Sequence, residues 1–417
     1  MLTELQSLAD DLALRLKRDV AIDDPRSRLL AHSAHHGPMD EARTESILRL
    51  IAPPEVVAWV ASLRLERAVD DVVRLPPQPK LSTMARVVAP LRIAGELRGY
   101  LWVIDAEQSL SDPELKIVAE TAQSATLVLD RERLLEDLEA GRRRELLRDL
   151  LSDGQDVRKA AAKTLLNMES GPPGPTQALV LRVPSGPWSQ RHDLALMVDQ
   201  ALGRAARKAL PQTRCLHLAR GDHGLLVVPA GRSSRDTGGN VAKVARAEIQ
   251  AALAIGGVTS ALGDPVPELE NLVSSYAEAR EALRVAEIVP GFGIHVTWSE
   301  LGVYRILVHL PLNKLPPDAV PPKLLALLDT PGGRELVHTV EVYLDEAADV
   351  RRSVAQLNIH RTSLYYRLGR FADLTGLDLS DGGDRLAVHL GLKLARLGGL
   401  YRSSSPRWGP GRLDAKP

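Results

Sequence analysis

Residues 350–371 contain five arginines and no Asp or Glu, although the chain as a whole carries 53 basic and 53 acidic residues. Guanidinium groups form bidentate hydrogen bonds with phosphates and guanine edges, and Thr or Tyr hydroxyls donate to phosphates or bases. This focused charge predicts a surface for double-stranded DNA. The side chains expected on it are Arg351, Arg352, His360, Arg361, Thr362, Ser363, Tyr366, Arg367 and Arg370.

Two short helices joined by a tight turn would position these side chains. Asp349 is a suitable N-cap for a first helix that ends near Leu357. The three-residue link 358–360 is too short for an ordinary loop, and Ala355 is a small residue where we expect the two helices to cross closely. The core face predicted for this helix is Val350, Val354 and Leu357.

The second helix is expected over residues 361–371. At about 100° per residue, one stripe of this helix holds Leu364, Leu368 and Phe371. The opposite, polar face holds Thr362, Tyr366 and Arg370. The pair therefore has the pattern of a helix-turn-helix whose second helix enters a DNA major groove. The alternative is an ordinary amphipathic helix pair with a solvated basic face.

A set of residues in and around this motif matches a known domain. They are Glu335, Leu336, Thr339, Tyr343, Leu344, Ala355, Leu357, His360, Arg361, Tyr366, Arg367, residues 374–379 and residues 384–386. Through them, residues 323–397 resemble the C-terminal helix-turn-helix of PucR/CdaR-type bacterial transcriptional regulators. The family usually has His-Arg-Asn-Thr at the start of the second helix, where this chain has His-Arg-Thr-Ser at 360–363. The resemblance implies a DNA-binding domain over 323–400 and leaves its base preference open.

Length and composition limit the class of protein. With 417 residues, of which 44% are hydrophobic, the chain is long enough for two to four domains with their own cores. Its single cysteine, Cys215, cannot form an internal disulfide, which is typical of a reducing compartment. No run approaches the roughly 18 apolar residues that span a bilayer, and residues 1–19 are amphipathic and acidic rather than signal-like. We therefore expect a cytoplasmic protein without a membrane anchor.

The N-terminal segment combines hairpins and helices. Strands are expected at 20–22 paired with 27–32 and at 86–93 paired with 97–104, and helices up to residue 19 and over 41–51 and 55–65. This order predicts an α+β sandwich over 1–135. It is similar to a GAF-like domain, which implies a sensor for a small-molecule effector, although the sequence identifies neither the ligand nor its binding residues. A protein-interaction module without a ligand is the alternative.

A long helix is expected to follow this segment. Ser111 and Glu114 form a capping box with a proline in the first turn, and no further proline occurs up to residue 151. Apolar residues recur at helical spacing: Leu115, Val118, Ala122, Ala125, Leu129, Leu134 and Leu138. We interpret residues 111–151 as a connector helix and dimer seam. The alternative is two helices with a break near Gly141.

The middle segment, residues 152–310, mixes strands and helices. Strands are expected at 178–183, 215–219, 225–228 and 254–258, and helices over 193–209, 241–252 and 267–288. This alternation predicts an α/β domain with a mixed sheet and helices outside it. Residues 276–279 and 301–304 carry a resemblance to the degenerate GGDEF-like, or cyclase-like, domain found in such regulators.

The hairpin loop of the middle segment bears on whether it is an enzyme. Active cyclases have Gly-Gly-Asp/Glu-Glu-Phe here, whereas residues 220–224 of this chain are Arg-Gly-Asp-His-Gly. Nucleotidyl transfer needs carboxylates to hold Mg²⁺, and Asp222 alone does not supply them. His32, His35 and His36 share no metal-ligand spacing with another His, Cys or carboxylate. We expect no catalytic residue, metal or cofactor; a nucleotide-processing enzyme is the less favoured alternative.

The C-terminal part separates into a linker, a domain and a tail. Residues 311–322 predict a stiff proline-rich linker, and residues 401–417 a disordered tail. The expected fold class is multidomain α+β: GAF-like sandwich, connector helix, central GGDEF-like α/β domain and all-α helix-turn-helix. The expected function is a homodimeric regulator that binds a palindromic or repeated operator under control of the N-terminal segment. A ligand-free dimeric DNA-binding scaffold is the alternative.

Overall fold

The computed structural model describes residues 2–35, 37, 39–65, 71–168, 171–172, 174–186, 193–211, 213, 215–230, 234–289, 291–310 and 319–400. The chain divides into two compact units, residues 1–141 and 142–417. The predicted tail at 401–417 and most of the predicted linker, residues 311–318, lie outside the described residues. Within the described part, no helix is both long and apolar enough to cross a membrane.

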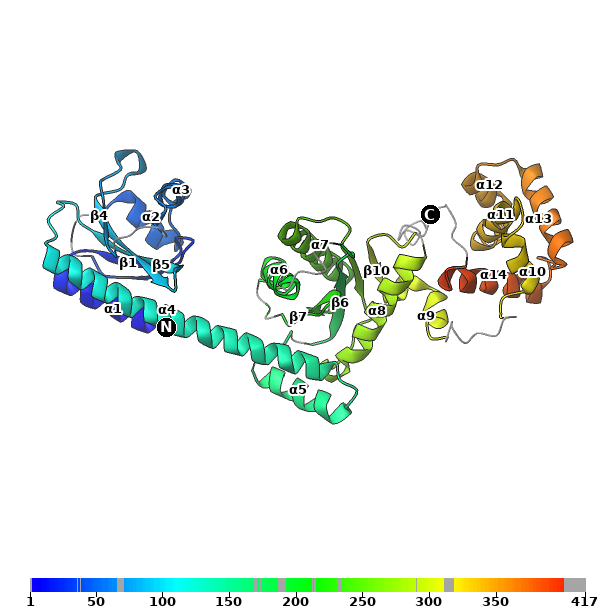
Figure 1. Ribbon diagram of the computed structural model, residues 1–417, viewed down its shortest axis with the longest axis horizontal. Helices are drawn as coiled ribbons and strands as arrows, with labels where there is room; N and C mark the ends of the chain where they lie inside the picture. Colours follow the sequence, from blue (N-terminus) through cyan, green and yellow to red (C-terminus); the bar gives the residue numbers. More distant parts are fainter. Residues whose placement is uncertain are drawn as a thin grey trace. The chain divides into compact units, whose positions relative to one another are not determined.

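The first unit is built on a five-stranded antiparallel sheet with strand order β2-β1-β5-β4-β3 (Figure 1). Its strands are β1 (Val20–Asp23), β2 (Leu29–His32), β3 (Val73–Leu75), β4 (Arg86–Ile93) and β5 (Glu96–Ile104). Both predicted hairpins are confirmed. Strand β3 was not predicted, because three residues are too few to show an alternating pattern.

Helices cover both faces of this sheet. Helices α1 (Leu2–Leu16) and α4 (Asp112–Leu150) pack on one face, and α2 (Glu41–Arg49) and α3 (Pro54–Ser62) on the other. Strand β5 shows why: Leu101 and Val103 join the core beneath α1 and α4, while Tyr100 and Trp102 face α2 and α3. Successive side chains on a strand alternate between faces, so one strand supplies both cores.

Helix α4 is continuous over 39 residues, so the predicted connector forms and the alternative with a break at Gly141 is wrong. The backbone N–H and the hydroxyl of Ser111 both donate to Glu114 Oε2, at 2.7 and 2.6 Å, and start the helix as the capping motif predicts. Near its other end, Leu147 and Leu150 are fully buried in the core of the second unit.

The second unit begins with a mixed sheet of order β10-β9-β6-β8-β7, in which only β10 and β9 run parallel. The strands are β6 (Thr176–Arg182), β7 (His217–Ala219), β8 (His223–Pro229), β9 (Thr259–Leu262) and β10 (His295–Thr297). The strand predicted at 254–258 is wrong. Ala254 and Gly257 adopt positive φ angles of 53° and 76°, so the chain turns there and enters β9 only at Thr259.

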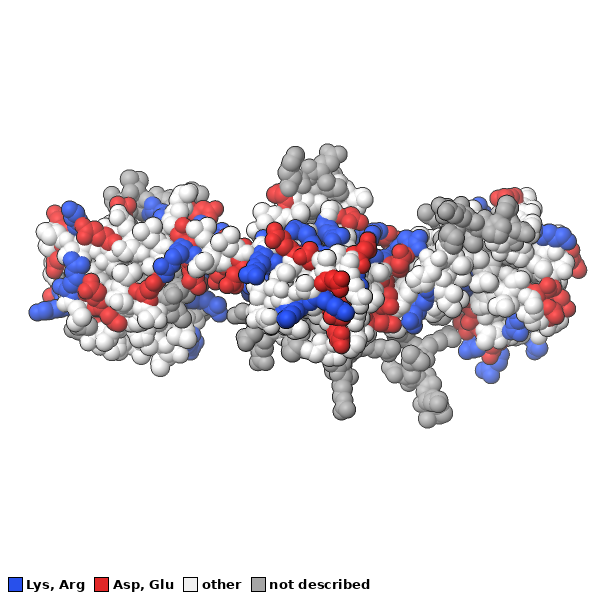
Figure 2. All heavy atoms as spheres, turned by 90° about the horizontal axis from the view of Figure 1, so that it is seen from below, with Lys and Arg blue, Asp and Glu red and all other residues white. Residues whose placement is uncertain are grey.

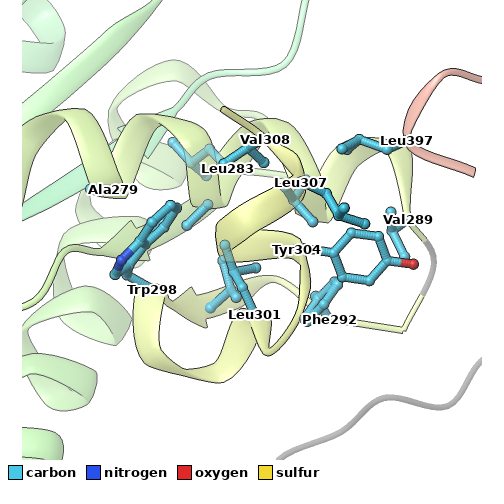
Figure 3. Packing of buried hydrophobic residues seen from close by; sticks show 14 of the residues in the cluster. Ala279, Leu283, Val289, Phe292, Trp298, Leu301, Tyr304, Leu307, Val308 and Leu397 are labelled. Carbon is cyan, nitrogen blue, oxygen red and sulfur yellow. The ribbon is translucent and has the colours of Figure 1, made fainter. Parts of the chain in front are cut away.

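Four helices cover this mixed sheet. Helices α6 (Leu194–Ala209) and α7 (Ser234–Leu253) pack on one face, and α5 (Gln155–Asn167) and α8 (Leu272–Ile288) on the other. Two short 3-10 turns, η4 (Leu269–Asn271) and η5 (Trp298–Leu301), precede α8 and α9 (Tyr304–Leu307). Figure 3 shows the core around α9, where the rings of Phe292 and Tyr304 meet edge to face with centroids 5.9 Å apart.

Five helices follow in residues 319–400, as expected for an all-α domain. They are α10 (Pro322–Leu328), α11 (Gly333–Asp345), α12 (Val350–Leu357), α13 (Arg361–Thr375) and α14 (Gly382–Leu397). Phe371 on α13 and Val340 on α11 are fully buried at the centre of this bundle. At the end of α14, Leu397 joins the cluster that contains Tyr304 (Figure 3).

Candidate nucleic-acid interface

The turn between α12 and α13 has the predicted caps. Asp349 Oδ1 accepts a hydrogen bond from the Arg352 N–H at 2.9 Å and starts α12. Asn358 ends α12 with a left-handed φ of 54°, a conformation that Asn tolerates better than most residues. His360 then caps α13, since its Nδ1 accepts from the N–H of Thr362 at 3.4 Å. The link therefore contains no residue beyond those the two helix ends require.

The buried face of α12 differs from the prediction. Val350, Val354 and Leu357 are only partly buried, and Ala355, expected at the helix crossing, is exposed. Ser353 is the fully buried residue of α12. Its hydroxyl donates to the Asp349 carbonyl at 2.6 Å, so a small polar side chain fits the core without an unsatisfied group.

Helix α13 confirms the predicted division into a buried and an exposed face. Leu364 and Phe371 are fully buried and Leu368 is partly buried. Thr362, Tyr366 and Arg370 are all exposed. The helix extends beyond the predicted end to Thr375, where Gly376 adopts a φ of 71° and its N–H bonds back to the Ala372 carbonyl.

Two of the five arginines are held by the protein's own acceptors. Arg367 Nη2 lies 2.5 Å from Glu335 Oε1, and its Nη1 donates to Thr339 Oγ1 at 3.2 Å. Arg352 donates to the Glu346 carbonyl at 2.8 Å and lies 3.4 Å from the Glu346 carboxylate. These guanidiniums fasten α13 to α11 and α12 to the turn before it, which the sequence did not reveal.

The other three arginines remain on the surface. Arg351, Arg361 and Arg370 are exposed and form no ion pair with another side chain of the described residues. Arg361 lies over Tyr365, with its Cζ 5.4 Å from the ring centroid and its Nη2 3.2 Å from the hydroxyl. Tyr365 is half exposed and was missed by the sequence prediction, although its i+4 spacing from Arg361 indicates the contact.

Two predicted positions have a smaller surface role. His360 is exposed, but its Nδ1 is occupied at the helix cap, where it also lies 2.9 Å from Thr362 Oγ1. Ser363 is partly buried. The part of the predicted set that lies open on α12 and α13 is therefore Arg351, Arg361, Thr362, Tyr366 and Arg370.

A buried ionic network supports this pair of helices from behind. On α11, Glu341 accepts a hydrogen bond from Arg396 Nη2 at 2.5 Å, and Asp345 accepts from Lys393 and His389 of α14 at 2.9 and 2.7 Å. Burial opposes ionisation of Asp345, but the His389 hydrogen bond and the Lys393 ammonium outweigh it and lower the pKa of Asp345. Removing one partner would leave a buried charge uncompensated, so the network holds α11 and α14 together.

Positive charge is local to the helix-turn-helix rather than general. Residues 323–400 contain ten basic and ten acidic residues, yet none of the acidic ones lies within 350–371. Figure 2 shows acidic and basic side chains interspersed over the visible face of the molecule. A nucleic acid would therefore be attracted to α12 and α13 specifically.

The hairpin loop of the mixed sheet has a different character. Asp222 lies 2.6 Å from His223 Nδ1, and His223 Nε2 lies 2.6 Å from the Tyr276 hydroxyl. Burial lowers the pKa of His223, while the His223 hydrogen bond lowers the pKa of Asp222. Asp222 is thus engaged with a buried imidazole, and the described residues contain no group of three His, Cys, Asp or Glu side chains placed to hold a metal ion. This is a structural hydrogen-bond chain in place of a cyclase centre.

Two family models match the second unit. Residues 336–394 match the PucR C-terminal helix-turn-helix domain, and residues 153–285 match the GGDEF-like domain. The first match includes α12 and α13 with the whole candidate interface. The second includes the hairpin loop with Asp222 and His223.

Relatives match almost the whole chain. The proline-responsive transcriptional activator PutR of Bacillus subtilis (strain 168) is 22% identical over 414 residues, covering 94% of this chain and 97% of its own length. The DNA-binding transcriptional activator AdeR of the same organism is 21% identical over 402 residues, covering 94% and 93%. The crystal structure of a regulator of polyketide synthase expression from Bifidobacterium adolescentis is similar to 61% of this chain and covers 97% of that chain, at 19% identity and a TM-score of 0.30.

These matches confirm the resemblance expected from the sequence. The relatives are regulators rather than enzymes, which agrees with the hairpin loop, where one carboxylate bonds to a buried histidine. The chain carries a GGDEF-like domain followed by a PucR-type C-terminal helix-turn-helix domain, and it is a DNA-binding transcriptional regulator.

Proposed function

We propose that this regulator is a cytoplasmic homodimer that binds a palindromic or repeated operator and whose N-terminal domain senses a small molecule. The observation that carries the DNA-binding part is the exposed face of α13, where Thr362, Tyr366 and Arg370 point outward without a carboxylate among them. Both relatives are named transcriptional activators, which favours activation over repression.

On DNA, α13 would lie in the major groove and α12 across the backbone, as in other helix-turn-helix proteins. The N-terminal residues of a recognition helix approach the base edges, which assigns Arg361 and Thr362 to base contacts. Arg351 and Arg370 would then contact phosphates. Stacking on Tyr365 fixes the Arg361 guanidinium before DNA arrives, so less side-chain entropy is lost on binding.

The dimer would form along α4. Leu127, Leu134 and Leu138 are between 57% and 70% exposed and recur at intervals of seven and four residues, the spacing of a coiled-coil seam. Large apolar side chains gathered on one exposed stretch of a helix indicate a partner helix. A second copy of the same helix fits this pattern, because two recognition helices are needed for a two-fold operator.

The sensory role is assigned to the first unit. It has its own sheet, two separate cores and helices on both faces, which is the construction of an independent α+β module. We propose that this module is GAF-like and that its ligand shifts the equilibrium between states of the dimer with different operator affinity.

Genome-wide recovery of DNA bound by the full chain tests the regulator assignment. We expect discrete promoter fragments with wild-type protein and loss of those fragments with Arg361→Ala and with Arg370→Ala. A recovery profile that is the same for wild type and both variants would reject the assigned DNA-binding face.

Sedimentation of the full chain tests the dimer. Leu134→Lys combined with Leu138→Lys should convert the dimer to monomer, because two charges would be buried in the seam. Glu136→Lys on the same turn of α4 changes the charge of an exposed residue and should leave the dimer intact. A monomeric wild type, or a dimer that survives the double substitution, contradicts the seam.

A further inference from the structure

The first unit contains a cavity of about 40 Å³ between its sheet and the helices α2 and α3. It lies on the face of β5 that carries Trp102, and its apolar wall includes Val56 and Val60 of α3. A single water occupies roughly 30 Å³ in the liquid, so the space suits a group of a few heavy atoms rather than a large ligand. Its polar wall includes Asp23 of β1, Arg43 of α2 and Arg86 of β4.

Asp23 offers this cavity a carboxylate without a matched partner. Among the described residues it forms no ion pair within 4 Å, and it is partly buried at the end of β1. Burial raises the pKa of Asp23 to about 7, and the nearby Arg43, Arg86 and Trp102 only partly offset that effect. A cationic group in the cavity would remove the electrostatic cost of ionising this carboxyl group.

Two buried donors face the same space. Trp102 is 7% exposed and Arg43 is 6% exposed, and both line the cavity. The Trp102 Nε1–H and the Arg43 Nε–H form no hydrogen bond of normal geometry in the protein, whereas Arg43 Nη2 donates to the Val20 carbonyl at 2.8 Å. Unpaired buried donors are costly, and an anionic acceptor would satisfy both.

The remaining charges of the site are already matched. Asp40 caps α2 by accepting from the Arg43 N–H at 2.8 Å, and it also accepts from the Met84 N–H at 2.8 Å and from Arg86 Nη2 at 2.5 Å. Asp40 and Arg86 therefore form a structural pair that joins α2 to β4. The groups left for a ligand are one carboxylate and two N–H donors.

From this arrangement we infer that the cavity binds the head group of a small α-amino acid. Its ammonium would pair with Asp23, its carboxylate would accept from Trp102 and Arg43, and its first side-chain carbons would contact Val56 and Val60. A simple amine leaves both donors unpaired, and a simple carboxylate leaves Asp23 unpaired. The inference rests on the proposed sensory function of the first unit and names the ligand class of that sensor.

Calorimetric titration of the full chain tests the cavity. The probes are glycine, alanine, serine, valine and proline, with methylammonium and acetate as the two half-ligands. We expect at least one amino acid to bind and to raise the unfolding temperature, and each half-ligand to bind at least about 10-fold more weakly. Absence of binding by all five amino acids, or equal binding of a half-ligand, overturns the inference.

Variants locate the binding. Asp23→Asn should weaken amino-acid binding by about 10- to 100-fold, because it removes a charge-assisted hydrogen bond. Trp102→Phe removes only the indole donor and provides a second variant should the first fail to fold. Glu55→Gln, an exposed carboxylate on α3 beside the lining residue Val56, should bind as wild type does. Wild-type affinity in both cavity variants would exclude this site.

Operator retention, measured on the same samples, separates the two proposals. Specific operator binding that no amino acid alters, together with a blank titration, rejects the cavity and leaves the DNA-binding regulator intact. Amino-acid binding that depends on Asp23, in a protein that retains operator DNA with unchanged affinity, supports the cavity and rejects the proposed sensory control.

Discussion

Arg367 and Arg370 lie three residues apart on α13, and the structure predicts that their removal has different effects on DNA binding. Arg370 is exposed and unpaired with any described side chain, whereas Arg367 is held by Glu335 and Thr339. Each phosphate contact adds about 0.9 to the slope of log K against log salt, so the two copies of Arg370 in a dimer contribute about 1.8. Across a fourfold rise in salt, from about 50 to about 200 mM, those contacts account for about a 12-fold loss of affinity.

Fluorescence anisotropy with an operator recovered from the genome measures this directly. The Arg370→Ala protein should show a salt slope lower by about 1.8 than wild type, and its affinity deficit should shrink about 12-fold over that salt range. Arg367→Ala should keep the wild-type slope and lose up to about 1 kcal/mol of stability, as expected for a partly exposed ion pair. Equal slopes for wild type and Arg370→Ala, or a flattened slope for Arg367→Ala, would refute the division of the arginines.

Three further predictions concern single positions. Arg361→Ala should reduce discrimination at one base pair of each half-site by about 1–3 kcal/mol, measured with single-base operator variants; unchanged preference at every position would move Arg361 to the backbone. Ser353→Val should destabilise the C-terminal domain by about 1–3 kcal/mol through overpacking, whereas Ala355→Val should change its unfolding by less than about 0.5 kcal/mol; equal effects would contradict the corrected face of α12. Burial raises the pKa of Asp23 to about 7 from the ordinary 3.8, so the folded state holds this proton more tightly than the unfolded state and the stability of the first unit falls as pH rises through that window. Asp23→Asn should abolish that fall and stabilise the unit by up to about 4 kcal/mol at pH 8, measured by calorimetry without ligand; a destabilised variant would show that the carboxylate is already satisfied.

The elements that were predicted from sequence are those with strong local signals. The β4–β5 hairpin alternates over eight and nine residues, and α13 combines a cap with a regular apolar stripe. Helix α12 has only eight residues, so several faces fit its pattern about equally well. Ser353 and Ala355 are both small, and only the tertiary contact decides which one lies inside. The strand at 254–258 failed because Gly256 and Gly257 mark a turn that its apolar neighbours concealed.

The candidate sites depend on contacts that no local pattern contains. Glu335 is 32 positions before Arg367, and their ion pair exists only because α11 packs against α13. The count of five arginines therefore overstates the charge available to DNA. In the first unit, Asp23, Arg43 and Trp102 are far apart in the sequence, and the strand order β1-β5-β4 brings them to one cavity. A sequence search for a clustered polar motif would miss such a site.

The same sheet limits how a ligand could act on the dimer. The cavity lies on the face covered by α2 and α3, whereas α4 packs on the opposite face. Any structural effect of the ligand on α4 has to cross β5, where Trp102 faces the cavity and its neighbours Leu101 and Val103 pack beneath α1 and α4. These neighbours are fully buried, and close-packed interiors transmit small displacements rather than absorb them. Truncating Val103 to Ala should therefore weaken the coupling between ligand and operator while leaving ligand affinity near wild type, which operator titrations with and without amino acid would measure. Unchanged coupling would place the signal path around the sheet edge instead of through β5.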